Sequence, residues 1–341
     1  MTDTQNEVFK TPVNKIRLFE HGAPGSQNLK LTRKYYTEYM PDGRVKHIVQ
    51  NITDPDIVPY IPDGIGNSTD RQRIPAVLII PGGAFRRLVY NFEGEDVAKW
   101  LNSMGIAAFV LECRLPSDEH DNAEDVPLID AMRAMRVIRG RAQEFGIDEA
   151  KIGVMGFSAG GFMAALLSTA YESDVYADYK GFYSYEHLED YSYEGLARMY
   201  ADYKYKDEYD KLSARPDFAV CSYPVISIDD CIEAGKRYMS EEQVLERISD
   251  GKAKILHKYN PDKLVRPDMP PVFICETDDD RTTLSENSVG FYMAARKAGV
   301  SAELHIFRTG GHGYGCGDDF AQTGEWKVLF TKWIKSIGII S

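Results

Sequence analysis

The sequence G-x-S-x-G occurs at positions 156–160, where Ser158 stands between small residues. Apolar runs at 151–155 and 162–167 flank it, a pattern that predicts a buried strand, a sharp turn and a helix. Glycines at such a turn avoid clashes where the helix passes close to the strand. The turn presents the Ser158 hydroxyl at a helix N-terminus, where backbone N–H groups favour a developing negative charge. Ser158 is therefore the predicted nucleophile.

A glycine-rich stretch, PGGA at 81–84, follows an apolar run at 76–80 that predicts a fully buried strand. In a hydrolase, a loop of this kind supplies backbone N–H groups to the oxygen of the reacting carbonyl. We predict that Gly83 or Ala84 donates to this oxyanion beside Ala159, the residue after the nucleophile. An ordinary turn is the alternative interpretation.

Acidic residues and a histidine follow downstream, in the order that a serine hydrolase needs. Aspartates crowd residues 276–280, just after a strand predicted at 272–275, where a carboxylate is able to reach a histidine ring. A solvated charge run and a cation site are the alternatives, although a metal site needs more ligands than this stretch offers. His312 lies in a glycine-flanked loop at 309–315, whereas His305 lies within a strand-like run and is predicted to be structural. The order serine, acid, histidine is that of α/β-hydrolases.

Strand-like and helix-like runs alternate, which predicts an α/β fold with a mostly parallel, doubly wound sheet and helices on both faces. The predicted strands are 76–80, 106–111, 152–156, 218–223, 272–275 and 302–307. The predicted helices are 92–103, 127–144, a run from 159, 240–249 with a Ser240 and Gln243 capping box, 285–298 and 320–337. Pieces at 45–49 and 57–61 predict an antiparallel sheet edge, and residues 1–30 are predicted to wrap the surface. We expect residues 1–341 to form a single domain.

The composition restricts the partners of the protein. A formal net charge of -12 on 341 residues argues against nucleic acid or an anionic membrane as a partner. Five cysteines without a C-x-x-C pair are predicted to be reduced core residues: Cys113, Cys221, Cys231, Cys275 and Cys316. The sequence shows no secretory signal at its start and no apolar run near the ~18 residues of a membrane span, so a cytoplasmic location is expected. Whether the protein forms a homo-oligomer stays open.

Residues from about 50 to 337 resemble the bacterial esterase group of the α/β-hydrolase superfamily that contains acetyl-xylan esterases and related sugar-ester hydrolases. The stretches that carry the resemblance are PGGAF at 81, EGEDVAKWLNSMGIAAFVLECRLP at 93, PLIDAMRAMRVIRGRAQEFGID at 127, IGVMGFSAGGF at 152, SARPDFAVCSYPVIS at 213 and NSVGFYMAARKAGVSAELHIFRTGGHGYG at 287. In that group the acid is the first aspartate of a T-x-D-D stretch, which implies Asp279 here, with Asp278 and Asp280 as alternatives. Ala84 and Phe162 depart from the group, because a third glycine and a histidine are usual at these positions.

The resemblance implies a serine carboxylesterase that hydrolyses short-chain, acetyl-type esters of carbohydrates through an acyl-enzyme. Because the start of the sequence shows no secretory signal, we expect imported oligosaccharides, rather than intact polymer, as the substrates. Ser158 would attack the ester, His312 would accept its proton, and Asp279 would orient His312, without a metal or an organic cofactor. The alternatives are a feruloyl-type or general carboxylesterase, a prolyl-peptidase-like hydrolase and a non-catalytic binding scaffold.

Eleven tyrosines occur from Tyr171 to Tyr209, around a segment at 172–212 that the resemblance does not cover. Tyrosine combines a flat apolar face with a polar tip, which suits sugar stacking and partly hydrated protein interfaces. The segment is predicted to form a cap or a subunit interface, and a surface excursion packed on the domain is the alternative.

Overall fold

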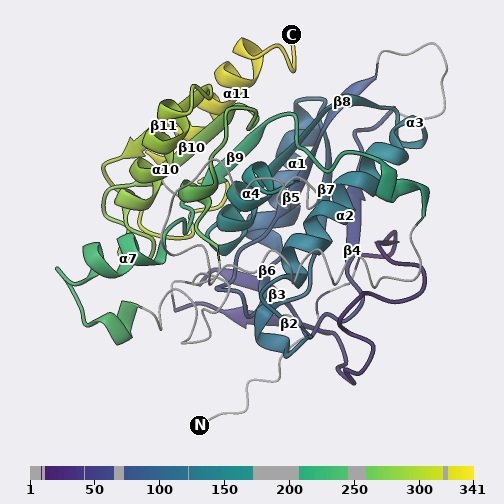
Figure 1. Cartoon of the computed structure of the whole chain (residues 1–341), viewed down its shortest axis with the longest axis horizontal. Coiled ribbons are helices and arrows are strands. Elements are labelled where there is room, and N and C mark those ends of the chain that lie inside the picture. The colour runs from purple at the N-terminus through teal and green to yellow at the C-terminus, as the bar shows by residue number, and fades with distance from the viewer. Residues whose placement is uncertain are drawn as a thin grey trace.

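An eight-stranded sheet forms the centre of the computed structural model (Figure 1). The residues described are 9, 12–41, 43–64, 73–121, 123–171, 207–244, 259–317 and 322–341. The strand order is β1-β4-β7-β5-β8-β9-β10-β11, with β1 and β4 antiparallel at one edge and the others parallel. The strands are β1 (Ile16–Arg17), β4 (Asp56–Tyr60), β5 (Ile74–Ile80), β7 (Ala107–Glu112), β8 (Ile147–Phe157), β9 (Ala219–Ser222), β10 (Val272–Thr277) and β11 (Ala302–Phe307).

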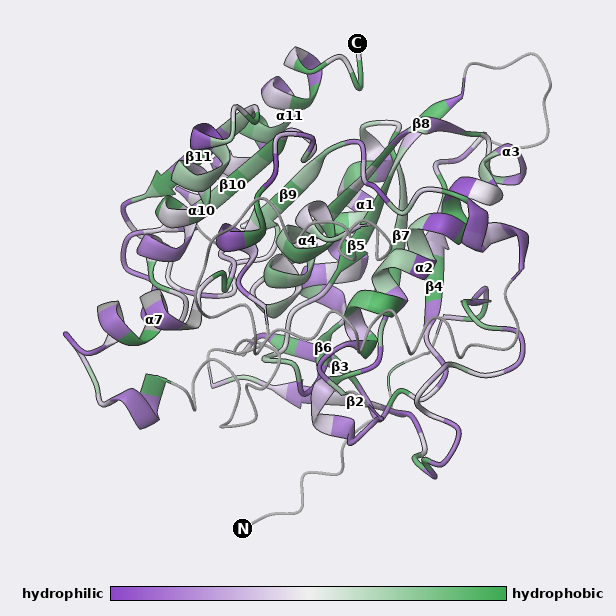
Figure 2. Ribbon diagram, viewed as in Figure 1, coloured by the Kyte–Doolittle hydropathy of each residue, from purple (hydrophilic) through white to green (hydrophobic). Residues whose placement is uncertain are grey.

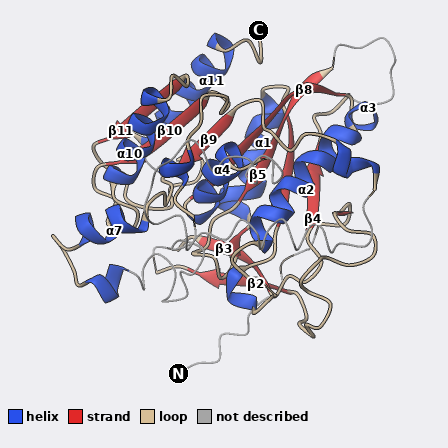
Figure 3. Ribbon diagram, in the orientation of Figure 1, coloured by secondary structure: helices blue, strands red, loops and turns tan. Residues whose placement is uncertain are grey.

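Helices cover both faces of this sheet, as Figure 3 shows. On one face α2 packs against α4, and the short helix η6 contacts both α4 and α10. On the other face Trp100 of α1 packs edge-on against Trp326 and Phe330 of α11. The α-helices are α1 (Asp96–Ser103), α2 (Val126–Gly140), α3 (Ala142–Phe145), α4 (Ala159–Thr169), α7 (Ile228–Gly235), α10 (Ser285–Lys297) and α11 (Trp326–Ser336). The shorter turns are η1 (Asn91–Glu95), η2 (Pro116–Asp118), η5 (Glu208–Lys211), η6 (Pro261–Leu264) and η7 (Thr323–Glu325).

The predicted α/β fold is confirmed, although several elements have other bounds. The strand expected at 152–156 begins earlier, at Ile147. The helix expected at 127–144 is interrupted at Arg141, just after Gly140, where the ring of Tyr209 packs so closely that a Cβ would lie 2.4 Å from it. The helix expected at 92–103 begins with a π-helical turn, η1.

The capping box predicted at Ser240 is present. The Ser240 N–H donates to Gln243 Oε1 at 2.9 Å, and the Gln243 N–H donates to Ser240 Oγ at 3.3 Å. The rest of the helix predicted at 240–249, from residue 245, lies outside the described residues, as does the start of the helix predicted at 320–337.

A second sheet of three antiparallel strands contains β2 (Lys34–Tyr39), β3 (Val45–Gln50) and β6 (Leu88–Val89). The prediction that the pieces at 45–49 and 57–61 share one sheet edge is therefore wrong for the first piece. Ile48 and Val49 of β3 are fully buried, and β3 pairs with β2 and β6 instead of joining the edge of the large sheet. Only the second piece, β4, borders the large sheet, where it pairs antiparallel with β7.

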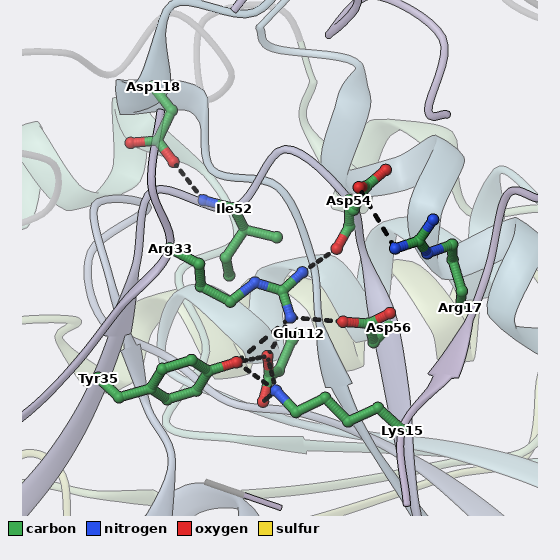
Figure 4. Close-up of polar contacts among 9 residues, drawn as sticks. All are labelled: Lys15, Arg17, Arg33, Tyr35, Ile52, Asp54, Asp56, Glu112 and Asp118. Carbon is green, nitrogen blue, oxygen red and sulfur yellow. Dashed lines mark hydrogen bonds and ion pairs between the residues drawn. The ribbon is translucent and has the colours of Figure 1, made fainter. Parts of the chain in front are cut away.

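A buried carboxylate at the end of β7 fastens the N-terminal segment to the sheet (Figure 4). Glu112 is fully buried and accepts hydrogen bonds from Lys15 Nζ at 2.7 Å, Arg33 Nη1 at 2.8 Å and the Tyr35 hydroxyl at 2.8 Å. Arg33 also pairs with Asp56 at the start of β4. Burial lowers the pKa of Lys15 and raises the pKa of Asp56. Two cations balance two carboxylates, so the cluster is a structural connection between the N-terminal segment and the sheet.

Hydrophobic residues follow the central strands, and hydrophilic residues gather on loops and outer helix faces (Figure 2). Strands β9 and β10 are buried along their whole length. Four cysteines are buried as predicted, namely Cys113, Cys221, Cys275 and Cys316, while the side chain of Cys231 lies outside the described part of the structure. Within the described ranges, no helix has the length and apolar character required to cross a membrane.

Most of the tyrosine-rich segment, residues 172–206, lies outside the described residues, so its role as a cap or interface stays a prediction. Its C-terminal end is described and is bound to α2. Arg133 of α2 forms ion pairs with Asp207, which caps the turn η5, and with Asp210 inside that turn. These ion pairs fix the point at which the segment rejoins the domain.

Candidate active site

Ser158 lies on the sharp turn between β8 and α4, as the sequence predicted. Its backbone has φ 54° and ψ -119°, a conformation that costs a non-glycine residue roughly 1–3 kcal/mol. Neighbouring elements hold this strained turn, because the Ser158 N–H donates to Ser222 O at 3.0 Å and the Phe162 N–H donates to Ser158 O at 3.0 Å. The serine is thus presented at the N-terminus of α4.

Two glycines allow the strand and the helix to approach at this turn. A Cβ on Gly156 would lie 1.9 Å from Gly160 O, and a Cβ on Gly160 would lie 2.0 Å from Ile80 O. The first turn of α4 therefore contacts the end of β5 directly. This contact places Ala159 beside the loop that follows β5.

We expect Gly156→Ala to lower the free energy of unfolding by about 3 kcal/mol or more, because a backbone carbonyl cannot move aside as a side chain can. Urea denaturation of the purified variant measures this loss. Gly299→Ala is the control, since its new methyl group would meet no atom within 4 Å and only its φ of 81° opposes the change. That substitution should cost about 1 kcal/mol. Equal losses in the two variants would contradict the close approach of strand and helix.

His312 connects Ser158 to an aspartate. Its Nε2 lies 2.9 Å from Ser158 Oγ, and its Nδ1 lies 2.7 Å from Asp280 Oδ2. The carboxylate fixes the ring proton on Nδ1, so the lone pair of Nε2 faces the serine hydroxyl. The loop that carries the ring, residues 309–315, is called the histidine loop below. Gly311 and Gly313 have φ values of 62° and 77°, which glycine adopts without strain.

The predicted contact between Asp279 and His312 is wrong, and the neighbouring Asp280 makes it instead. Asp279 Oδ1 accepts the N–H of Gly311 at 2.8 Å, so Asp279 supports the histidine loop without contacting the ring. The chain turns tightly here, because the Asp280 N–H donates to Thr277 O at 3.3 Å. This turn brings Asp280 back over the end of β10, where it is fully buried, and leaves Asp278 exposed.

Backbone and hydroxyl donors hold Asp280 in addition to His312. Asp280 Oδ1 accepts the N–H groups of Thr282 at 2.6 Å and Thr283 at 3.1 Å, and Oδ2 accepts the Thr283 hydroxyl at 3.0 Å. Burial alone would raise the pKa of Asp280, but the charge of His312 and these donors hold it below its usual value. An aspartate that accepts from residues two and three positions later has a recognisable sequence, here D-R-T-T. That signal points to Asp280.

The electrostatics around His312 would suit a base. Burial would lower the pKa of His312, but the charge and hydrogen bond of Asp280, together with the charge of Glu93, raise it above its usual value. A higher pKa makes the imidazole a stronger acceptor for the Ser158 proton. The ring is 24% exposed, and Tyr223 packs edge-on against it at a centroid distance of 5.1 Å.

The loop at 81–84, called the oxyanion loop below, packs against the nucleophile turn. A Cβ on Gly82 would lie 2.9 Å from Ser158 Cβ. Gly83 and Ala159 line the same narrow cavity of about 20 Å³, and the lining described for it does not include Ala84. As the first residue of α4, Ala159 has an N–H without an acceptor inside the helix. The structure thus brings Gly83 and Ala159 together beside the serine.

The sequence-based predictions missed two buried residues of the site, Glu93 and Tyr223. Glu93 Oε2 accepts the Gly82 N–H at 2.8 Å, and Oε1 accepts the Tyr223 hydroxyl at 3.0 Å. Because its N–H is occupied in this way, Gly82 is not the donor for a substrate oxygen. Neither residue belongs to a motif of fixed spacing, but Glu93 begins one of the stretches that carry the family resemblance and Tyr223 lies in another, which is the sequence signal for them.

The other predictions for this region concern His305 and metal ligands. His305 is structural as predicted, because it lies in β11 and its Nε2 lies 2.8 Å from Glu303 Oε1. Among the residues that the structure describes, no three histidine, cysteine, aspartate or glutamate side chains gather in an arrangement for a metal ion.

Comparisons with known proteins relate the whole arrangement to enzymes. The chain matches the family model described as BD-FAE over residues 65–294. It is 28% identical over 264 residues to an acetylxylan esterase of Xylanibacter ruminicola, covering 77% of this chain and 45% of that protein. It is also 28% identical over 251 residues to endo-1,4-beta-xylanase B of Butyrivibrio fibrisolvens, covering 73% of this chain and 34% of that protein. The chain therefore spans less than half the length of these curated relatives.

A solved structure is similar over nearly its full length. It is an acetyl ester-xyloside bifunctional hydrolase from Caldicellulosiruptor lactoaceticus, with a TM-score of 0.62 and 35% sequence identity. The match covers 85% of this chain and 91% of that chain.

Proposed function

Because the chain belongs to the BD-FAE family, within the esterase group of the α/β-hydrolase fold, we propose that it is a serine carboxylesterase acting on short-chain, acetyl-type esters of carbohydrates. The observation that carries this proposal is the continuous connection from Ser158 Oγ through His312 to Asp280, with distances of 2.9 Å and 2.7 Å. A nucleophile, a base and an acid in this geometry support acyl transfer.

The first step forms an acyl-enzyme. His312 Nε2 takes the proton of the Ser158 hydroxyl as Oγ attacks the carbonyl carbon of the ester, and the C=O electron pair moves onto oxygen. Backbone N–H groups of the oxyanion loop, from Gly83 or Ala84, and of Ala159 stabilise this oxyanion. When the intermediate collapses, His312 gives its proton to the sugar oxygen, which leaves as an alcohol.

The second step releases the acid. His312 takes a proton from water as the water oxygen attacks the acyl carbon, and the same N–H groups hold the second oxyanion. Collapse breaks the bond to Ser158 Oγ, which recovers its proton from His312. Asp280 stabilises the charged imidazole in both steps. These residues supply the nucleophile, base and oxyanion donors, so the reaction proposed here needs no metal or organic cofactor.

The proposed substrates are acetylated xylo-oligosaccharides. One similar protein is named an acetylxylan esterase and another an acetyl ester-xyloside bifunctional hydrolase, which supports both the acyl group and the sugar. The cavity lined by Gly83 and Ala159 lies beside the serine turn, where an acyl group would be held during the reaction.

A panel of p-nitrophenyl esters, run beside acetylated xylo-oligosaccharides, tests this function. We expect kcat/KM to be highest for acetate and to fall at least about tenfold by octanoate, as proposed from the acetyl esters for which two similar proteins are named. Acetate should be released from the oligosaccharides. A higher kcat/KM for octanoate would reject the short-chain proposal, and a preference for methyl ferulate would favour a feruloyl-type esterase. If no ester is turned over and a serine-directed phosphonate does not label Ser158, the protein is not a serine esterase.

A further inference from the structure

Glu93 is a buried carboxylate that the proposed acyl-transfer steps do not use. It lies in the π-helical turn η1, where the Glu95 N–H donates to Tyr90 O, five residues earlier, at 2.8 Å. Such widened turns are rare and frequently occur at functional sites. A Cβ on Gly82 would lie 2.7 Å from Glu93 Oε2 and 2.9 Å from Ser158 Cβ, so Gly82 is enclosed between the carboxylate and the nucleophile.

The hydrogen bonds around Glu93 connect the two loops of the site. On one side its carboxylate accepts the N–H of Gly82, in the oxyanion loop, at 2.8 Å. On the other side it accepts the hydroxyl of Tyr223, and this hydroxyl oxygen accepts the N–H of Gly315, in the histidine loop, at 2.9 Å. Because Gly315 donates to the tyrosine oxygen, the tyrosine proton points to Glu93. Both carboxylate oxygens therefore receive donors, as an ionised carboxylate requires.

The same carboxylate acts on His312. The Tyr223 hydroxyl donates to Glu93, and the Tyr223 ring packs edge-on against His312 at a centroid distance of 5.1 Å. Glu93 and His312 therefore both contact Tyr223. The charged groups that act on His312 are Asp280 from the loop after β10, Glu93 from η1 and Lys46 from β3. The two carboxylates favour the protonated imidazole, and Lys46 opposes it.

We propose that Glu93 is a positioning residue, whose carboxylate holds the oxyanion loop and, through Tyr223, the histidine loop, and whose charge stabilises protonated His312. This inference rests on the proposed esterase function, because the protonated imidazole forms when Ser158 attacks the ester. Burial raises the pKa of the Glu93 carboxyl, whereas the charge of His312 and the donors Gly82 and Tyr223 oppose that rise. Glu93 is therefore held most firmly as an anion when His312 carries its proton.

Glu93→Gln tests the charge while keeping the shape. Its amide oxygen can accept from the Gly82 N–H and its amide nitrogen can donate to the Tyr223 oxygen. We expect kcat for p-nitrophenyl acetate to fall about tenfold with KM changed less than about threefold. We expect the acid limb of kcat/KM against pH to move to lower pH by ~0.5 or more, because loss of a nearby negative charge lowers the pKa of His312. The downfield ring N–H signal of His312 in NMR reports the same shift without substrate.

Glu95→Gln is the matched control, because it removes one negative charge from the same turn. Glu95 is partly exposed and pairs with Lys99 at 2.8 Å, so its substitution should leave the pH profile and the His312 signal unchanged. Coincident profiles for wild type and Glu93→Gln, or equal shifts in the two glutamine variants, would overturn the inference.

Tyr223→Phe tests the positioning role apart from the charge of Glu93. It also provides a test if Glu93→Gln does not fold. It keeps the ring and the Glu93 charge but removes the hydroxyl that connects the loops. We expect kcat to fall at least about threefold, while the His312 titration stays near that of wild type. An unchanged kcat would overturn the positioning role. If the wild-type protein hydrolyses no ester, the proposed function fails, and the NMR titration of Glu93→Gln still decides whether its charge acts on His312.

Discussion

Replacing Ser158 with alanine is expected to reduce kcat for p-nitrophenyl acetate by about 10⁴-fold or more while the protein stays folded. The reason is that no acyl-enzyme forms without the hydroxyl that lies 2.9 Å from His312 Nε2. Alanine should also relieve little of the turn's strain, because its Cβ meets the same backbone restriction at φ 54°. The absorbance of released p-nitrophenol measures the activity, and circular dichroism with urea denaturation checks the fold.

Ser168→Ala provides the control from the same helix. Ser168 is also buried, and its hydroxyl donates to Ala164 O at 2.7 Å within α4, away from the histidine. Its substitution should leave kcat within about twofold of wild type. Residual turnover above about 1% in a purified, folded Ser158→Ala protein would show that another group supplies the nucleophile.

Asp280→Asn is expected to lower kcat by about 10³–10⁴-fold, whereas Asp279→Asn should lower it by less than about tenfold. An amide at 280 no longer fixes the ring proton on Nδ1, so His312 loses both its tautomer and its charge partner. At 279 an amide oxygen still accepts the Gly311 N–H, so the histidine loop keeps its support. Steady-state kinetics of both variants at one pH, above the acid limb, measures the contrast.

Asp278→Asn completes this series, because Asp278 is exposed and its substitution should have no effect. Equal losses at 279 and 280 would contradict the assignment of Asp280. A larger loss at 279 would restore the acid implied by the family resemblance and would require the turn after β10 to change in solution.

The sequence by itself predicted the serine and the histidine of the candidate site and determined the type of fold. These are local properties: a strand, small residues and a helix at 147–169 leave few alternatives to a sharp turn at Ser158. The glycines around His312 likewise mark a loop that needs left-handed backbone. Continuous apolar runs such as β5 and β10 predict buried parallel strands, because both of their faces must be covered.

The sequence did not determine the layer to which β3 belongs or the π-helical turn η1. A strand's partner depends on residues distant in the chain, and β3 pairs with β2 and β6 although β4 follows it directly. Periodicity predicts a helix across 92–103, but it cannot show that the first turn is widened by one residue into a π-helical turn. Glu93 lies inside this widened turn and is buried there.

Only the tertiary structure decided which aspartate meets His312 and which buried groups surround the site. Asp278, Asp279 and Asp280 are chemically identical neighbours, so nothing in the sequence apart from the local D-R-T-T pattern separates them. Their directions are set by the turn from Thr277 to Asp280, and their partners come from a loop some thirty residues later in the chain. Glu93 likewise meets Tyr223 from 130 residues away. Such contacts depend on the packing of whole elements, because a side chain's partner is fixed in space and not along the chain.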